Sequence, residues 1–316
     1  MAIKTLDDLL ATESPPWIWE GMLRPSGLTL LAAYPKVGKT TFIAYLLRAM
    51  WTEDFYMGLS INPVPTLVVS EEADTLIAQR AVALGYSPMW PIGWLTPEPG
   101  RTWDHILAYI RKYASMYHNP LIVVDTLSRH WGIDDENDNA KVERAMNPLI
   151  EIARSTGAAI LLVHHTRKSG GAGGAASRGG SAIVGAVDII LELQRYSRDD
   201  KTNKRKIESY SRYAETPGRE DPMVIQLSEE GYIVKDDETA ESGVKGSERD
   251  IRYWLLSNPG WWTIDSIAAA TAIPRRTVAD ALKLLLFEET VEQRGEGKKN
   301  KPFTYAASEY GLEEGN

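Results

Sequence analysis

The sequence predicts an α/β protein with a mostly parallel, twisted sheet, helices on both faces of that sheet, and a smaller C-terminal unit. The main observation is that four short apolar runs, each as long as a buried strand, alternate with helical segments. This alternation favours a parallel sheet with right-handed crossovers. The second observation is a change in the sequence pattern near residue 182, after which strand-like segments follow one another through short turns.

The elements of the core follow in chain order. The four apolar runs are residues 28–33, 66–70, 121–124 and 159–163. The helical segments between and after them are residues 41–51, 75–84, 103–117 and 139–155. The later strand-like segments are residues 187–193, 207–213, 223–227 and 232–235. We expect these later strands to extend the sheet on one edge, partly antiparallel.

Composition divides the chain into five segments. They are an N-terminal arm (1–27), the core (28–235), a linker (236–247), a second domain (248–308) and an acidic tail (309–316). The linker is acidic, contains Gly and Ser, and has few apolar residues. A length of 316 residues also favours two domains over one.

Bulk composition narrows the class of protein. Hydrophobic residues make up 43% and charged residues 25%, as in soluble globular proteins. The sequence contains no Cys, which excludes disulfides and thiolate metal sites and fits a reducing cytosol. No apolar run approaches the ~20 residues that cross a bilayer, and residues 1–10 do not form a secretory signal. We therefore expect a cytoplasmic protein without membrane contact. The net charge of −8 means that any DNA contact comes from local basic patches.

A phosphate-binding motif is predicted at residues 33–40, which read Ala-Tyr-Pro-Lys-Val-Gly-Lys-Thr between a strand and a helix. Backbone N–H groups at a helix N-terminus, together with the helix dipole, bind phosphate, and Gly38 allows close approach. Lys39 would reach the β- and γ-phosphates of ATP, and the Thr40 hydroxyl would ligate Mg²⁺. Ala33 stands where the strict pattern has Gly. A methyl group is tolerated at this position if φ is negative. The residues expected to contact the nucleotide are Pro35, Lys36, Val37, Gly38, Lys39, Thr40 and Thr41.

Acidic residues follow two of the predicted strands. Asp125 ends the third apolar run, where it can hold Mg²⁺ through water, although an Asp there can also cap a turn. Glu71 is the first residue past the second run and is predicted to orient or deprotonate the attacking water. Its neighbour Glu72 is more simply interpreted as an acidic residue at the start of the following helix. A helix-start role for Glu71 as well stays an alternative.

Two histidines end the fourth apolar run. A polar side chain at this position can contact the γ-phosphate and respond to its loss. Strand alternation directs only one of the two toward the nucleotide, and we expect His165 rather than His164. A metal site is the alternative, but His is scarce in this sequence and Cys is absent.

The ordered set of motifs resembles the RepA-like AAA ATPases, which are RecA-fold proteins of plasmids, phages and bacteria. The resemblance covers residues 15–235. It rests on the 33–40 motif, Ser-Glu-Glu at 70–72, Val-Val-Asp-Thr-Leu-Ser at 123–128, Val-His-His-Thr-Arg-Lys at 163–168 and Ala-Ser-Arg-Gly-Gly-Ser at 176–181. It implies a RecA-like P-loop core, ATP hydrolysis, assembly into rings and, in the best-known members, replicative helicase activity. It supports the roles given above to Lys39, Thr40, Glu71, Asp125 and His165. Arg80 matches a recurrent arginine without an assigned role.

The sequence departs from the family at one position. The resemblance implies an arginine acting on a neighbouring subunit a short distance past the Arg-Gly-Gly-Ser segment, and Asp188 stands there instead. Arg212 is the best substitute, followed by Arg195. A solvated strand arginine is the alternative interpretation of Arg212.

A glycine-rich loop at residues 168–180 is the candidate site for single-stranded DNA. In RecA-fold proteins the corresponding loop lines the centre of the ring. Flexible backbone with cations can follow phosphates without reading bases. The cations are Arg167, Lys168 and Arg178. A loop without a ligand is the alternative. A second basic cluster, within residues 195–206, fits a solvated turn, a DNA contact or a subunit contact equally well.

Residues 248–308 resemble a winged helix-turn-helix. Its third helix would enter the major groove of duplex DNA with Arg275 and Arg276, and a basic hairpin would contact phosphates. The hairpin cations are Lys298, Lys299 and Lys301. Nearby acidic residues keep a protein-docking role open.

These observations predict an ATP-driven, DNA-associated motor in a homo-oligomeric ring, either a RepA-type replicative helicase or a DNA-remodelling ATPase. The alternative is an ATP switch that regulates DNA or loads a helicase without translocating. A metabolic P-loop kinase is a third class. It is disfavoured because no second-substrate pocket is evident and a winged helix follows the core.

Overall fold

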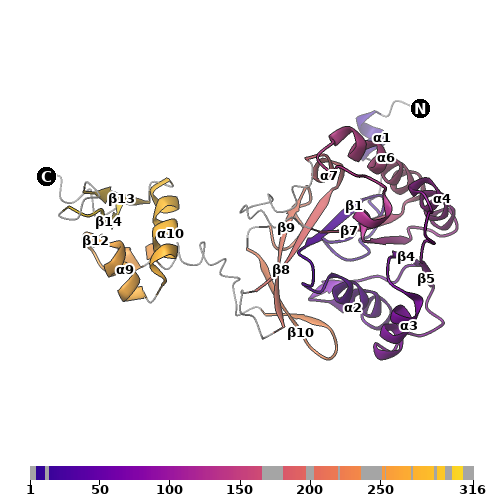
Figure 1. The fold of residues 1–316 in the computed structure, drawn as a ribbon, viewed down its shortest axis with the longest axis horizontal. Coiled ribbons are helices and arrows are strands. Elements are labelled where there is room, and N and C mark those ends of the chain that lie inside the picture. The colour runs from indigo at the N-terminus through magenta and orange to yellow at the C-terminus, as the bar shows by residue number, and fades with distance from the viewer. Residues whose placement is uncertain are drawn as a thin grey trace. The chain divides into compact units, whose positions relative to one another are not determined.

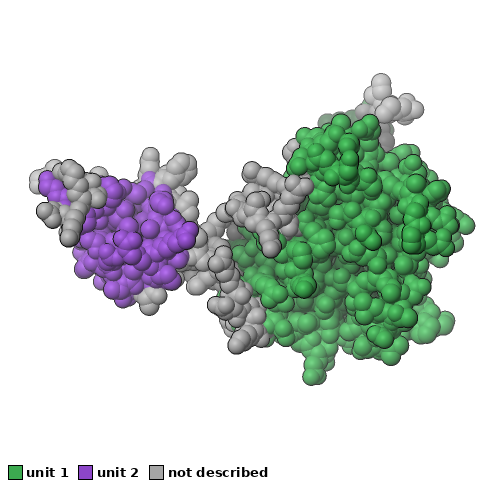
Figure 2. All heavy atoms as spheres, in the orientation of Figure 1, with its two compact units in different colours: residues 1–239 green, residues 240–316 purple. Residues whose placement is uncertain are grey.

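The computed structural model describes residues 5–10, 14–165, 181–196, 203–219, 221–235, 251–252, 254–271, 273–287, 290–295 and 301–308. The chain forms two compact units, residues 1–239 and 240–316, which Figure 2 shows in different colours. The predicted linker at 236–247 and the predicted tail at 309–316 lie outside the described residues.

The first unit contains a nine-stranded sheet with the order β11-β10-β9-β8-β1-β7-β6-β4-β5. The six neighbouring strands from β8 to β5 are parallel, whereas β9, β10 and β11 are joined to the sheet by antiparallel pairing. This arrangement confirms the predicted mostly parallel α/β core. The parallel strands are β1 (Leu28–Ala33), β4 (Thr66–Ser70), β5 (Ile92–Leu95), β6 (Leu121–Asp125), β7 (Ala159–His165) and β8 (Ile189–Arg195). The antiparallel strands are β9 (Lys204–Ser211), β10 (Met223–Leu227) and β11 (Tyr232–Val234).

Helices cover both faces of this sheet (Figure 1). One face packs against α2 (Lys39–Thr52), through residues such as Phe42 and Leu46. The opposite face packs against α4 (Trp103–Ala114), α6 (Asn139–Thr156) and α7 (Ser181–Ala186). The remaining elements of the first unit are α1 (Leu6–Leu10), the hairpin of β2 (Phe55–Tyr56) and β3 (Leu59–Ser60), α3 (Asp74–Ala83) and α5 (Leu127–His130).

The N-terminal arm packs onto the α2 face. Trp19 is 1% exposed, and its ring lies against Phe42 and Tyr56. Its indole N–H donates to the Tyr56 carbonyl at 3.2 Å. The arm thereby covers α2, whose N-terminus carries the predicted phosphate motif.

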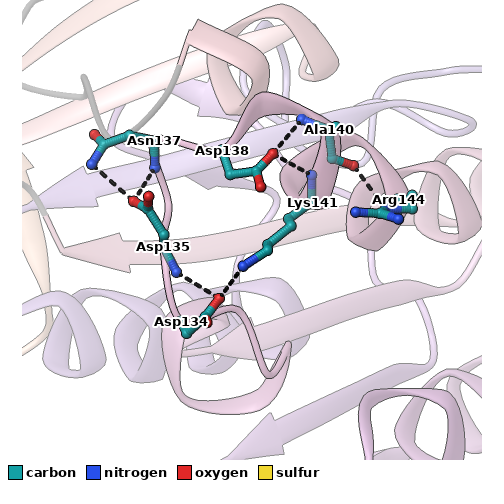
Figure 3. A network of polar contacts seen from close by, with 7 residues as sticks. All are labelled: Asp134, Asp135, Asn137, Asp138, Ala140, Lys141 and Arg144. Carbon is teal, nitrogen blue, oxygen red and sulfur yellow. Dashed lines mark hydrogen bonds and ion pairs between the residues drawn. The ribbon is translucent and has the colours of Figure 1, made fainter.

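The loop before α6 is ordered by its own polar groups. Asp138 caps α6 by accepting hydrogen bonds from the backbone N–H groups of Ala140 and Lys141. The Lys141 ammonium lies 2.7 Å from Asp134, as Figure 3 shows with the surrounding network. These contacts begin a helix whose apolar residues at i, i+4 and i+7 face the sheet. Gly157, at φ 78°, ends it.

The second unit has its own core. Residues 251–252 and 254–257 are helical, followed by β12 (Trp262–Thr263), α9 (Ile264–Thr271), α10 (Arg275–Phe287), β13 (Val291–Arg294) and β14 (Thr304–Ala307). The three strands form an antiparallel sheet in the order β12-β14-β13. The buried residues of this core include Ile251, Leu255 and Leu282. Among the described residues, no helix has the length and apolarity to cross a membrane.

Candidate nucleotide site

The predicted site residues meet at one edge of the sheet. Strands β1, β4, β6 and β7 are parallel, so their carboxyl ends lie together. The register sets Ala33 of β1 beside His165 of β7, and Ser70 of β4 beside Asp125 of β6. Ligands bind at this edge in open α/β sheets.

The N-terminus of α2 is built to receive an anion. Its N-cap is Gly38, which adopts φ 109° and forms no side-chain cap. The first bond of the helix runs from the Phe42 N–H to the Gly38 carbonyl at 2.8 Å. The first-turn N–H groups before Phe42 are the ones that a helix leaves without an intrahelical partner. A Cβ at position 38 would be strained by the positive φ and would lie 3.4 Å from the Tyr232 hydroxyl, so glycine suits this position.

Lys39 lies over the strand ends. It is 6% exposed, and its ammonium donates to the carbonyls of Ala33 at 3.0 Å and Tyr34 at 3.3 Å. It also lies 2.9 Å from Nδ1 of His165. Burial lowers the pKa of Lys39, although the charges of nearby carboxylates oppose this. Burial, and then the charge of Lys39, lower the pKa of His165, so its Nδ1 is a suitable acceptor for the ammonium.

His164 points elsewhere. It is 1% exposed, and its Nε2 lies 3.6 Å from the Glu136 carboxylate. Its ring packs edge-on against Trp131, with centroids 6.0 Å apart. Of the two histidines, the structure therefore brings His165 to Lys39.

Thr40 and Asp125 form the candidate magnesium site. The Thr40 hydroxyl donates to Oδ2 of Asp125 at 3.0 Å. Asp125 is 5% exposed, and burial raises its pKa to about 6; the carboxylates of Glu72 and Glu71 add to this rise, while Thr40 and Lys39 oppose it. A hydroxyl and a carboxylate beside each other are the oxygen ligands that Mg²⁺ prefers, and a cation there would stabilise the buried charge. These residues therefore fit the metal.

The structure separates the two glutamates after β4. Glu72 is held by Arg80, whose Nη2 lies 2.9 Å from Oε1 while Nη1 contacts Oε2. This ion pair gives Arg80 a structural role. Glu71 is more exposed, with the Thr126 hydroxyl at 3.5 Å and Arg129 Nε at 3.9 Å from its carboxylate.

A hollow of about 260 Å³ adjoins Glu71, between the loop at residues 96–101 and α5. It is smaller than the ~300–1,000 Å³ typical of small-molecule sites. It leaves room for water beside Glu71.

Arg212 lies away from this site. It follows β9, whose last residue pairs with the first residue of β8, at the sheet edge opposite the α2 N-terminus. Its guanidinium is 3.7 Å from Asp188, which also accepts the Leu28 N–H at 3.0 Å. Asp188 is therefore the partner of Arg212. Within one copy, the structure does not bring Arg212 to Lys39.

Sequence reasoning missed the contacts that hold the loop before α2. Arg205 donates to the Val37 carbonyl at 2.8 Å, and Arg195 donates to the Lys36 carbonyl at 3.2 Å. Both arginines belong to the basic cluster noted above. No sequence signal distinguishes them from solvated cations, because Arg205 and Val37 are 168 positions apart.

Several predicted DNA-binding residues lie outside the described part of the chain, namely Arg167, Lys168, Arg178, Lys298 and Lys299. In the second unit, Arg275 is exposed at the start of α10, with Nε 2.5 Å from Asp265. Arg276 and Lys301 are also exposed.

The fold and this site define a RecA-fold P-loop ATPase. A family model described as an AAA domain matches residues 3–171, more than half of the chain, so the protein belongs to this family. Among solved structures, a DnaB-like replicative helicase, described with its interactions with primase, aligns with TM-score 0.54 and 12% identity over 73% of this chain and 67% of that chain. The RadB recombinase aligns with TM-score 0.48 and 16% identity, over 67% of this chain and 92% of that chain. A search of curated proteins found no match. At such identities, the helicase supports the RecA-like fold alone.

Proposed function

We propose that this protein couples ATP hydrolysis to work on DNA, as a RepA-type replicative helicase or a DNA-remodelling ATPase. The observation that carries the ATPase part is the meeting of Lys39, Thr40, Asp125 and His165 at one sheet edge beside the α2 N-terminus. Mg²⁺, held by Thr40 and, through water, by Asp125, would neutralise charge on the β- and γ-phosphates.

The remaining residues take distinct roles in the proposed reaction. Lys39 turns from the Ala33 and Tyr34 carbonyls toward the β- and γ-phosphates. Glu71 accepts a proton from the attacking water, since this residue lines the hollow. Because His165 contacts Lys39 at 2.9 Å, any movement of that ammonium changes the environment of His165. His165 thus acts as a γ-phosphate sensor at the end of β7.

Arg212 is proposed to act on a neighbouring copy. It lies at the edge opposite its own phosphate-binding loop, so it can complete a nucleotide site only in trans. Its side chain is 68% exposed, which leaves it accessible to a second subunit. This role requires a homo-oligomer, and a ring is the arrangement we propose.

DNA binding is proposed for two regions. Arg167 and Lys168 come just after β7 and the sensor His165, and Arg178 comes just before α7, so a change at the γ-phosphate can reach this segment through the chain. In the second unit, the order helix–strand–helix–helix–strand–strand supports a winged helix, with Arg275 and Arg276 at the start of the helix proposed for duplex DNA.

The deciding experiment is the ATPase rate with and without single-stranded DNA, alongside native mass with ATP and a strand-separation assay. DNA-stimulated hydrolysis by an oligomer that separates strands is the expected result. Basal hydrolysis without unwinding would replace the motor with the alternative ATP switch. A Lys39→Ala variant that still binds and cleaves ATP normally would refute the nucleotide site itself.

A further inference from the structure

The loop that precedes α2 is bound by two arginines of the sheet extension, the part of the sheet formed by β8 and the antiparallel strands after it. Arg205, on β9, donates through Nε to the Val37 carbonyl at 2.8 Å. Arg195, on β8, donates through Nη2 to the Lys36 carbonyl at 3.2 Å. The two arginines are direct cross-strand partners in the β8–β9 ladder. One strand pair therefore binds two successive carbonyls of the phosphate-binding loop.

These bonds set the direction of backbone N–H groups. The peptide unit is planar and trans, so its carbonyl and its N–H point in opposite directions. With the Val37 carbonyl directed at Arg205, the N–H of Gly38 points away from β9. Lys36 and Gly38 both have positive φ, at 64° and 109°, and alternating backbone conformations of this kind form concave anion-binding groups of N–H donors.

Arg205 is itself fixed in place. Its Nη1 donates to the Lys204 carbonyl at 2.6 Å, and its side chain is half-buried. Ile207, two residues along on the same face of β9, is fully buried in the core that α2 covers. Arg205 thus extends from a packed strand, and it binds the carbonyl that directly precedes Gly38, a residue with positive φ.

We propose that Arg205 is a positioning residue of the nucleotide site, which orients the Val37–Gly38 peptide for phosphate binding and thereby sets nucleotide affinity. The inference rests on the proposed nucleotide site and assigns the sheet extension a part in it. A bond from a guanidinium is stronger than one between neutral groups. Arg205 acts on the loop rather than on the reacting atoms.

The test is the dissociation constant of MgADP, measured by calorimetry on the full chain, with KM and kcat for ATP alongside. Arg205→Gln is expected to weaken MgADP binding about ten-fold, the size of one charged hydrogen bond, and to raise KM more than it lowers kcat. Arg205→Lys keeps a charged donor and is expected to recover part of the affinity. Lys206→Gln is the matched control, because it removes the same charge from the opposite face of the same strand, and its affinity should be that of the unsubstituted protein.

Unchanged MgADP affinity in folded Arg205→Gln overturns the inference. If circular dichroism shows that this variant does not fold, Arg205→Met, which keeps the apolar stem, takes its place, and unchanged affinity there overturns the inference equally. Equal weakening by Lys206→Gln also overturns it, since general loss of charge would then be the cause. An unsubstituted protein that binds no MgADP refutes the nucleotide site and the proposed function, whereas normal binding that Arg205 does not affect refutes this inference alone.

Discussion

Replacing Asp125 by Asn should stabilise the metal-free protein while it abolishes Mg²⁺-dependent hydrolysis. The carboxylate is 5% exposed, and its pKa is raised to about 6, first by burial and then by two neighbouring glutamates. Asn has nearly the same shape and can still accept the hydrogen bond of the Thr40 hydroxyl. The substitution therefore removes a buried charge and keeps its main hydrogen bond.

The magnitude and its sign follow from the pKa. A carboxyl group whose folded-state pKa lies above its ordinary value of 3.8 loses its proton less readily in the folded protein, so it costs stability as the pH rises above 3.8. The cost is complete above pH 6, where a rise from 3.8 to about 6 corresponds to about 3 kcal/mol. At pH 5 about half of it is present. The gain from Asp125→Asn is at most this large, because the new amide must also find partners.

The assay is urea denaturation in EDTA at pH 8 and pH 5, with the free energy of unfolding compared between the variant and the unsubstituted protein. Asp54→Asn, at an exposed position, is the control for the same chemical change. A gain that is larger at pH 8 than at pH 5 is expected for Asp125→Asn alone. No gain at pH 8, or an equal gain at both pH values, would refute the argument from buried charge.

Three further predictions follow from contacts in the first unit. Glu71→Gln should lower kcat by about 10²–10⁴-fold with ATP binding retained. The Glu72 carboxylate is bound in an ion pair, so Glu72→Gln should keep most of kcat. The reverse pattern would exchange the roles of the two glutamates. Trp19→Ala should cost about 3–5 kcal/mol of unfolding free energy, because this fully buried ring packs on α2; a loss below about 1 kcal/mol in thermal or urea unfolding would contradict that packing. Mixing inactive Lys39→Ala and Arg212→Ala subunits should restore part of the ATPase rate, since mixed oligomers contain sites with both residues; a mixture as inactive as its components would argue against action in trans.

Prediction from the sequence worked best where the signal was local. The four apolar runs became β1, β4, β6 and β7, and β7 extends to His165. Strand β9 begins at Lys204 rather than at the predicted residue 207, because its first residues are half-exposed cations that give no apolar pattern. Strand β5 was not predicted: its residues are half-buried or exposed, and it includes a glycine. Edge strands bury one side at most, so their sequence pattern is weak.

The sequence by itself determined the type and order of the four buried strands β1, β4, β6 and β7 and the strand–loop–helix motif with Lys39 and Thr40, since these depend on periodicity and on residues a few positions apart. Only the tertiary structure decided which side chains meet: His165 with Lys39, Arg80 with Glu72, and Arg205 with the Val37 carbonyl. The physical reason is that a strand or helix is specified by short-range backbone preferences and burial. A contact between distant segments depends on strand order, register and side-chain packing, which the whole chain sets together.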